Sequence, residues 1–282
     1  MHAIDFLMLA ITASTPLLLA VEGEVVVQRS GIINLGIEGM MLAAAMGSVI
    51  AAQLTNRIAF GFAGGIAGAA LLGALFGFFA IVLRADQIVT GTAINLLALG
   101  ITGFIYRELQ QSEIFARAVQ FRGRNLVVPL AWIAVPIVLA IVLWRTIFGL
   151  RLRACGENPE AVTAARASVA GHRWAALGIE SILVGIAGAY LALALSSGFA
   201  ENMTAGRGYI ALSIVIFGRW KMKGVLLGTA LFGVAAAGQY ALQAAGHALP
   251  FHLLLAIPYV VTLLILCGIA GRVRAPESLG RA

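Results

Sequence analysis

The sequence predicts an all-α protein that crosses a membrane several times. Three observations predict this class: 61% of the 282 residues are hydrophobic, only 11% are charged, and the mean hydropathy is +0.98. A soluble domain is about 45–50% apolar and about 25% charged, so this chain has too few polar residues to cover a globule. The apolar runs are continuous and do not alternate, which disfavours a transmembrane β-barrel.

About nine apolar segments of roughly membrane length follow one another, separated by charged or turn-rich gaps. The expected spans are 4–21, 33–54, 58–83, 87–106, 128–148, 174–195, 205–218, 224–245 and 250–269. Together they form a single transmembrane domain over residues 1–282. The seventh segment is short for a full crossing and contains a GRG sequence, which is typical of the broken spans found at transport sites.

Basic residues predict the orientation of the chain, because Lys and Arg gather in short cytoplasmic loops. They are concentrated in residues 145–173, in residues 219–223 and in the C-terminal tail. An even number of spans separates each of these segments from the next, so all three are expected in the cytoplasm, and the N-terminus outside. The loop 107–126 falls outside in this scheme although it holds four Arg.

The segment RSGIINLGIEGMMLAAAM, residues 29–46, sets Asn34 and Glu38 into an apolar run. Four residues separate them, so on a helix they would share one face. A polar pair in a span is costly unless it meets a partner helix, a cavity or a substrate path. We therefore interpret the pair either as lining a path or as satisfied by a neighbouring helix. Asn95, an amide in a later span, has the same two interpretations.

Small residues recur every four positions through the third expected span. The stripe consists of Gly61, Gly65, Ala69, Gly73 and Gly77. Such spacing allows two helices to pack backbone to backbone in lipid. The stripe therefore predicts a helix-packing face in preference to a substrate path.

An internal duplication is suggested by two similar stretches. EGEVVVQRSGIINLGIEGMM begins at Glu22, and ENMTAGRGYIALSIVIFG begins at Glu201. Each has an acid-containing loop before a glycine-flanked apolar run. Five spans separate them, which would place them on opposite sides of the membrane, as in the inverted repeats of many transporters.

The cytoplasmic loop 150–172 contains the signals of a short helix. Gly156 interrupts the preceding helix, and Asn158 can cap a new one. Pro159 suits the first helical position, and Glu160 suits the first turn. This element is either a solvated connector or a docking helix for a cytoplasmic subunit.

Several sequence signatures of catalysis are absent. The chain has no GxxxxGK[ST] phosphate-binding loop, no His/Cys metal cluster and no GxSxG. We therefore predict no catalytic residue, no metal site and no cofactor bound by this chain. If ATP drives transport, a separate polypeptide must hydrolyse it.

Four stretches carry a resemblance to a known family: RSGIINLGIEGMMLAAA, ADQIVTGTAINLLALGIT, CGENPEAVTAA and GRGYIALSIVIFGRW. In this order they resemble the permease subunits of bacterial ABC importers for simple sugars and nucleosides, within the branched-chain amino acid/ribose permease family. The similarity covers nearly the whole chain and is strongest to the nucleoside branch.

The resemblance implies partners that composition does not show. A cytoplasmic ATP-binding subunit would hold ATP and Mg, a second permease subunit, homologous or identical, would complete the path, and an extracytoplasmic substrate-binding protein would deliver the solute. Nucleic acid is not an expected partner. The expected location is the bacterial plasma (inner) membrane. By position, the contact with the ATP-binding subunit would be formed by Gly156, Glu157, Asn158, Pro159 and Glu160.

The expected function is therefore inward transport of a nucleoside or a simple sugar by alternating access, with no bond chemistry on this chain. Three alternatives stay open. The chain could be an importer of a different small polar solute, or a secondary transporter driven by an ion gradient, with Glu38 as the coupling acid. It could also be a membrane scaffold that transports nothing.

Overall fold

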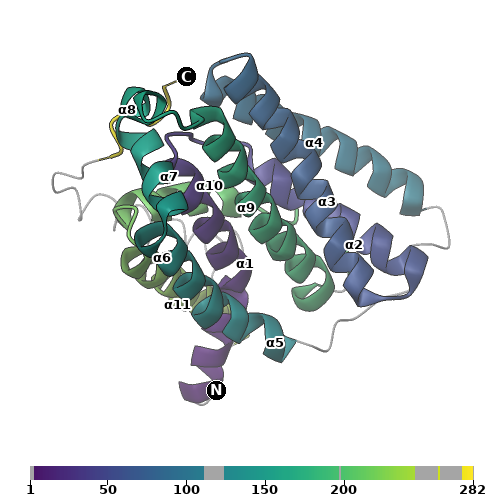
Figure 1. The fold of residues 1–282 in the computed structure, drawn as a ribbon. Coiled ribbons are helices and arrows are strands. Elements are labelled where there is room, and N and C mark those ends of the chain that lie inside the picture. The colour runs from purple at the N-terminus through teal and green to yellow at the C-terminus, as the bar shows by residue number, and fades with distance from the viewer. Residues whose placement is uncertain (1–2, 111–123, 197, 245–259, 261–274, 282) are drawn as a thin grey trace.

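The computed structural model describes residues 3–110, 124–196, 198–244, 260 and 275–281, and within these ranges the elements are helices without a strand. The long helices are α1 (Ala3–Arg29), α2 (Ile37–Thr55), α3 (Ile58–Gly77), α4 (Gln87–Gln110), α9 (Val169–Tyr190) and α11 (Met222–Ala244). The short ones are α5 (Arg124–Pro129), α6 (Val135–Arg145), α7 (Ile147–Glu157), α8 (Pro159–Ala164) and α10 (Arg207–Phe217). Three π-helical turns, η1 (Phe78–Val82), η3 (Leu130–Ala134) and η4 (Leu191–Leu195), continue or join them (Figure 1).

Seven described helices are long and apolar enough to cross a membrane. They run over Ala3–Arg29, Ile37–Thr55, Ile58–Val82, Gln87–Leu109, Leu126–Arg145, Val169–Leu195 and Met222–Gln243. The expected short span corresponds to α10, which has 11 residues. The all-α polytopic class is thereby confirmed. The ninth expected span, 250–269, lies outside the described residues.

The first helix is longer than the sequence predicts. The expected span ends at residue 21 with an acidic loop after it, whereas α1 continues through Glu22 and Glu24 to Arg29. Both acids are fully buried, because this part of α1 passes through the middle of the bundle. A Cβ on Gly23 would lie 3.1 Å from Cα of Glu180 in α9. The turn of α1 that holds Glu22 and Glu24 is surrounded by protein and not by lipid, so α1 continues through it.

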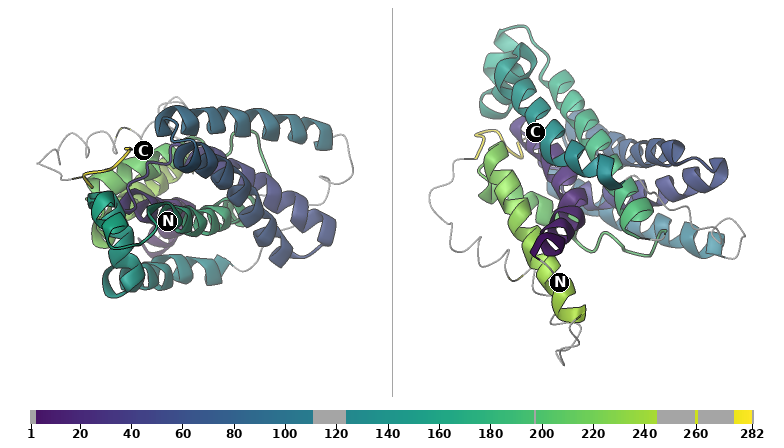
Figure 2. Two further views of the ribbon diagram at one scale, coloured as in Figure 1. Left: turned by 45° about the horizontal axis from the view of Figure 1, so that its top comes forward. Right: turned by 90° about the horizontal axis from the view of Figure 1, so that it is seen from below.

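Helices α1 and α9 form the centre of the bundle and pack against each other. On one side, α9 contacts α2 and α3, and α4 covers α2 at the edge. On the other side, α1 contacts α10 and α11. Figure 2 shows α2, α3 and α4 on one flank and α11 on the opposite flank.

The small-residue stripe of α3 is a packing face, as predicted. Gly61, Gly65, Ala69, Gly73 and Gly77 are all buried. A Cβ on Gly65 would lie 2.8 Å from the carbonyl oxygen of Gly185 in α9 and 3.2 Å from that of Ala44 in α2. The stripe therefore brings the backbones of three helices together.

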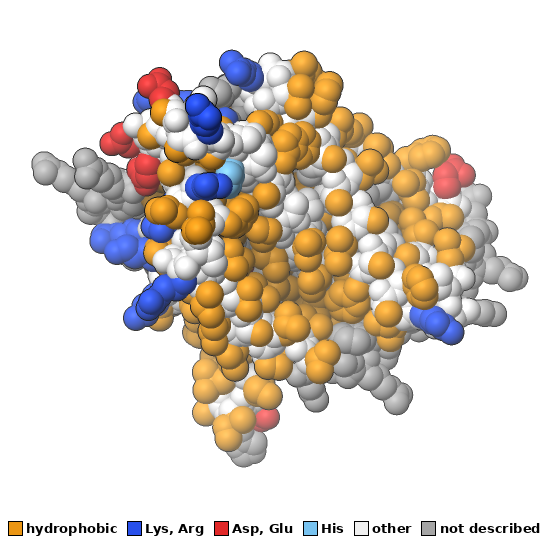
Figure 3. All heavy atoms as spheres, in the orientation of Figure 1, with side chains coloured by type: hydrophobic (Ala, Val, Ile, Leu, Met, Phe, Trp, Pro, Cys, Tyr) orange, Lys and Arg blue, Asp and Glu red, His pale blue; other side chains and the backbone are white. Residues whose placement is uncertain are grey.

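The three basic segments lie at one end of the bundle, as their spacing predicts. Arg29, at the end of α1, donates to the carbonyl oxygen of Trp220 at 2.8 Å. The amide of Ser278, in the tail, donates to the carbonyl oxygen of Gly156 at 2.9 Å. Figure 3 shows charged side chains gathered around α7 and α8, and broad hydrophobic faces below them.

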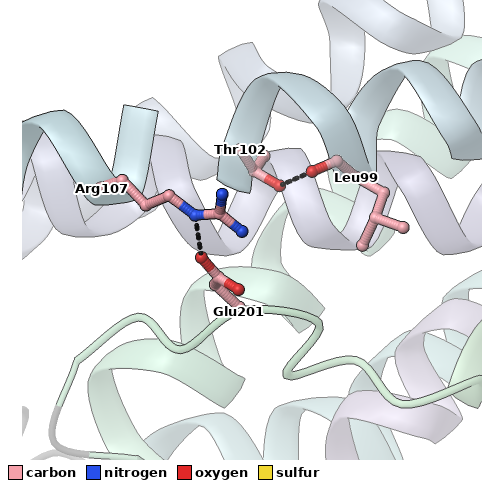
Figure 4. A network of polar contacts seen from close by, with 4 residues as sticks. All are labelled: Leu99, Thr102, Arg107 and Glu201. Carbon is pink, nitrogen blue, oxygen red and sulfur yellow. Dashed lines mark hydrogen bonds and ion pairs between the residues drawn. The ribbon is translucent and has the colours of Figure 1, made fainter. Parts of the chain in front are cut away.

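The opposite end carries an ion pair between α4 and the segment that precedes α10. Arg107 Nε lies 3.0 Å from Glu201 Oε1, and both side chains are exposed (Figure 4). Thr102, one turn earlier, donates back into its own helix to the carbonyl oxygens of Ala98 at 2.7 Å and Leu99 at 3.5 Å. Solvent screens an exposed pair of this kind, so it marks the end of the bundle without holding it together.

Candidate functional site

The N-termini of α2 and α10 meet inside the bundle at the carboxylate of Glu38. Its Oε1 accepts hydrogen bonds from Thr204 Oγ1 at 2.6 Å and from the amide of Gly206 at 2.8 Å. Its Oε2 accepts from the amide of Gly208 at 2.6 Å. Glu38 is 8% exposed. One side chain at the start of α2 thus binds the first amides of α10.

The meeting point lies within the membrane region, because α10 is too short to cross it. Its 11 residues rise about 16 Å, roughly half of the apolar core of a bilayer. The first amides of a helix are unpaired and carry partial positive charge. Two such ends face each other here, and the carboxylate between them supplies the acceptors and the negative charge.

Glycine permits this approach on the α10 side. Gly206 has φ +79°, in the left-handed region where a glycine is favoured. A Cβ on Gly208 would lie 2.7 Å from Cα of Glu38. The GRG sequence therefore both turns the chain and leaves room for the start of α2.

The expectation that Asn34 and Glu38 share one helix face is wrong. Helix α2 begins at Ile37, and Asn34 lies in the turn before it. The Asn34 side chain accepts from the amide of Gly36 at 3.0 Å, which forms the turn. Its Nδ2 donates to Glu180 Oε2 in α9 at 2.7 Å. Asn34 and Glu38 therefore contact opposite neighbours, α9 and α10.

Asn95 connects α4 to both helix starts. Its Oδ1 accepts from the amide of Gly39 at 2.8 Å, and its Nδ2 donates to the carbonyl oxygen of Leu35 at 2.8 Å. The same Nδ2 donates to the hydroxyl of Tyr209 at 2.9 Å. Tyr209 is 46% exposed and Asn95 is partly exposed. These two side chains thus bring polar groups from the helix junction to an accessible surface.

Sequence reasoning misses Tyr209, as well as a chain of buried polar groups behind Asn34. Trp220 Nε1 donates to Gln28 Oε1 at 2.6 Å, and Gln28 Nε2 donates to Glu24 Oε1 at 2.7 Å. Glu24 Oε1 also accepts from the amide of Asn34 at 3.4 Å. The chain runs from the basic end of the bundle to the junction. Its one sequence signal is the spacing of Glu24 and Gln28, four residues apart.

The short cytoplasmic helix predicted in loop 150–172 is present as α8. Asn158 Oδ1 caps it by accepting from the amide of Ala161 at 3.1 Å, and Pro159 occupies the first position. Glu157 and Glu160 are exposed. Gly156 is buried, and a Cβ there would collide with the carbonyl oxygen of Arg29. The two carboxylates thus face outward while the glycine fixes the loop against the end of α1.

A polar cavity of about 570 Å³ opens beside α8. Its walls come from α8, from the start of α9, from Arg84 after η1 and from the C-terminal tail, including Glu277 and Arg281. Burial beside the tail raises the pKa of the Cys155 thiol, which favours the neutral thiol there. Within the described residues no group of His, Cys, Asp or Glu is arranged to hold a metal ion.

Two helix starts that meet at a buried carboxylate inside a bundle of membrane-length apolar helices are typical of membrane transport proteins. The chain belongs to the family described as "Branched-chain amino acid transport system / permease component", which it matches over residues 6–268. It is therefore a permease of an ABC transporter, not an enzyme, and a multi-pass protein of the plasma membrane. Family membership implies ATPase and substrate-binding partners.

Named relatives match most of the chain. It is 36% identical to the nucleoside ABC transporter permease protein NupC of Lactococcus lactis, over 95% of this chain and 92% of that protein. It is 32% identical to the guanosine ABC transporter permease protein NupQ of Bacillus subtilis, over 95% and 92%. It is 36% identical to the putative glucose ABC transporter permease protein TsgC13 of Haloferax volcanii, over 85% and 78%. No solved structure matches the chain.

Proposed function

We propose that this ABC permease carries a nucleoside into the cytoplasm, with a simple sugar as the second candidate. The observation that carries the proposal is the similarity to two permeases named for nucleosides, which extends over 95% of this chain. The sugar candidate is supported by the relative from Haloferax volcanii, a putative glucose permease. Both solutes present hydroxyl groups, which amide and phenol side chains bind by hydrogen bonds.

The path for the solute passes the junction of α2 and α10 in this proposal. Asn95 and Tyr209 offer polar groups at an accessible surface there. Asn34 and Glu38, the other two predicted path residues, have little or no exposed surface, and their side chains bind neighbouring protein groups. We therefore propose that Asn34 and Glu38 position the helices that form the path, while Asn95 and Tyr209 contact the solute.

In this proposal the contact with the ATP-binding subunit lies at the basic end of the bundle. We propose that the ATP-binding subunit, with its ATP and Mg, docks on α8 and the turn that leads into it, with the contact formed by Gly156 to Glu160. The exposed carboxylates of Glu157 and Glu160 suit a polar docking contact. A second permease subunit and an extracytoplasmic binding protein complete the transporter.

The proposal is tested with the complete transporter in proteoliposomes. The permease is reconstituted with its ATP-binding and substrate-binding partners, and uptake of radiolabelled guanosine and glucose is measured with internal or external ATP. We expect guanosine uptake that requires ATP on the side of the ATP-binding subunit and stops when that subunit cannot hydrolyse it. Uptake of glucose without uptake of guanosine would identify a simple sugar as the transported solute. Uptake driven by an ion gradient without ATP would refute ATP-driven import.

Tyr209 provides a test of the path. Tyr209→Phe removes one hydroxyl, which is worth about 0.5–1.5 kcal/mol as a hydrogen-bonding group, so the uptake rate at subsaturating nucleoside should fall roughly two- to tenfold. Tyr240→Phe in α11 is the matched control, because Tyr240 is similarly exposed, at 42% against 46%. Equal uptake rates for the two variants at equal protein level would show that Tyr209 does not contact the solute.

A further inference from the structure

The C-terminal tail, Ala275–Arg281, lies against the loop that carries α8. Ser278 is 7% exposed. Its hydroxyl lies 2.7 Å from the carbonyl oxygen of Gly156 and 2.9 Å from that of Cys155. The Ser278 amide donates to the carbonyl oxygen of Gly156 as well, at 2.9 Å. The last turn of α7 is therefore bound by the tail directly before α8 begins.

The other side of the tail contacts the turn between α1 and α2. The amide of Gly280 donates to the carbonyl oxygen of Gly31 at 3.0 Å. Gly31 has φ +93°, and a Cβ on it would lie 2.9 Å from Ser278 Oγ, so the contact leaves no room for a side chain. Arg173, from α9, donates to the carbonyl oxygens of Ser30 at 3.4 Å and Arg281 at 3.3 Å, which ties tail and turn together.

This turn leads directly to the junction of α2 and α10. The amide of Ile33 donates to Gln87 Oε1 at the start of α4, at 2.8 Å. Asn34 follows, and α2 begins at Ile37, one residue before Glu38. A displacement of the turn would therefore move both the start of α2 and the attachment of α4.

The loop 147–164 and the turn 29–36 pack directly, with Gly156 against the carbonyl oxygen of Arg29, but within the described residues no hydrogen bond joins them, whereas Ser278 and Gly280 bond to one each. Coupling between distant sites needs a physically connected element that both sites can bias. We propose that the tail is this element: it transmits movement of the docking loop to the α1–α2 turn, with Ser278 as the positioning residue. The inference rests on the proposed function, because it requires an ATP-binding subunit docked at α8.

The test uses the complete reconstituted transporter and compares solute carried per ATP hydrolysed. Ser278→Ala removes the hydroxyl, whose single proton is shared between the carbonyl oxygens of Cys155 and Gly156, and should lower solute carried per ATP roughly fivefold while ATP hydrolysis continues. Gly31→Ala, on the opposite side of the same contact, should have the same effect. Ala275→Ser is the control, since this side chain is exposed in the same tail and does not line the cavity beside α8, and it should keep the wild-type ratio.

A second readout does not depend on which solute is carried. Amide hydrogen exchange over residues 30–36 should change when ATP binds the partner subunit, and Ser278→Ala should reduce that change by roughly half or more. A wild-type exchange response and a wild-type ratio in Ser278→Ala would overturn the proposal. So would a parallel fall in uptake and hydrolysis with loss of the ATP-binding subunit from the purified complex, since the tail would then only stabilise the docking loop. Failure of guanosine uptake in the wild type, with the exchange result intact, would count against the solute and not against the tail.

Discussion

Replacing Glu38 by alanine should abolish uptake and strongly destabilise the permease. The substitution leaves the amides of Gly206 and Gly208 and the hydroxyl of Thr204 without their acceptor, in a site that is almost closed to solvent. Hydrogen bonds to a charged group contribute about 1.5–3 kcal/mol each, so losing all three should cost about 5 kcal/mol or more. It also leaves two positive helix ends facing each other. Thermal unfolding of the purified protein and uptake by the reconstituted transporter measure the two effects.

Glu38→Gln distinguishes the contribution of the negative charge from that of the hydrogen-bond acceptors, because it removes the charge and keeps one acceptor oxygen. The glutamine oxygen can still accept from two donors, but its amide group would face the donor at Gly208, so stability should fall between wild type and Glu38→Ala. Glu201→Ala is the control for removing a carboxylate, because Glu201 forms an exposed, solvent-screened ion pair that adds little stability. If Glu38→Ala unfolds at the wild-type temperature, the two helix starts are not held together by this carboxylate.

Features that depend on short stretches of sequence could be predicted. Continuous apolar runs identify the spans because a helix in lipid must satisfy its own backbone. The cap and the proline that begin α8 are local signals, and the structure places Asn158 and Pro159 in those roles. The stripe containing Gly65 is equally local, since spacing alone puts small residues on one helix face.

Features that depend on what surrounds a helix could not be predicted in the same way. Glu22 and Glu24 suggest a loop when each span is considered alone, and they remain helical because α1 lies at the centre of the bundle. The start of α2 is set by the turn at Asn34, so the assumed common face with Glu38 does not exist. Ser278 carries no motif, and its position follows only from tertiary contact with Gly156.

The inverted repeat gains support from the same geometry while remaining a prediction. Helix α2 begins within the first of the two similar stretches and α10 within the second, and their N-termini meet at Glu38. Helix α10 ends near the basic end of the bundle, where Trp220 binds Arg29, while α2 runs away from that end (Figure 1). Two related segments that enter the membrane from opposite sides and meet at their N-termini are typical of transporters with inverted repeats.

Gly65→Leu should prevent accumulation of folded permease. The first added carbon alone would lie 2.8 Å from the carbonyl oxygen of Gly185 and 3.0 Å from Cβ of Ala189. These atoms belong to the backbone of α9 and a methyl group on it, so no flexible side chain can move aside. Overpacking of a tight core costs about 1–3 kcal/mol and sometimes more, and here the leucine must separate α3 from α9 and from α2. The fraction of monodisperse protein after solubilisation, followed by size-exclusion chromatography, measures the loss.

Ala67→Leu is the matched control, because Ala67 lies on the same helix two residues away and is exposed. A leucine there adds apolar surface on a face that the described bundle does not cover, so the yield of monodisperse protein should stay near the wild-type value. Gly65→Ala should lie between the two, since it introduces the first carbon of the clash without the rest. If Gly65→Leu and Ala67→Leu give equal yields, backbone contact along α3 does not hold the three helices together, and the stripe has another role.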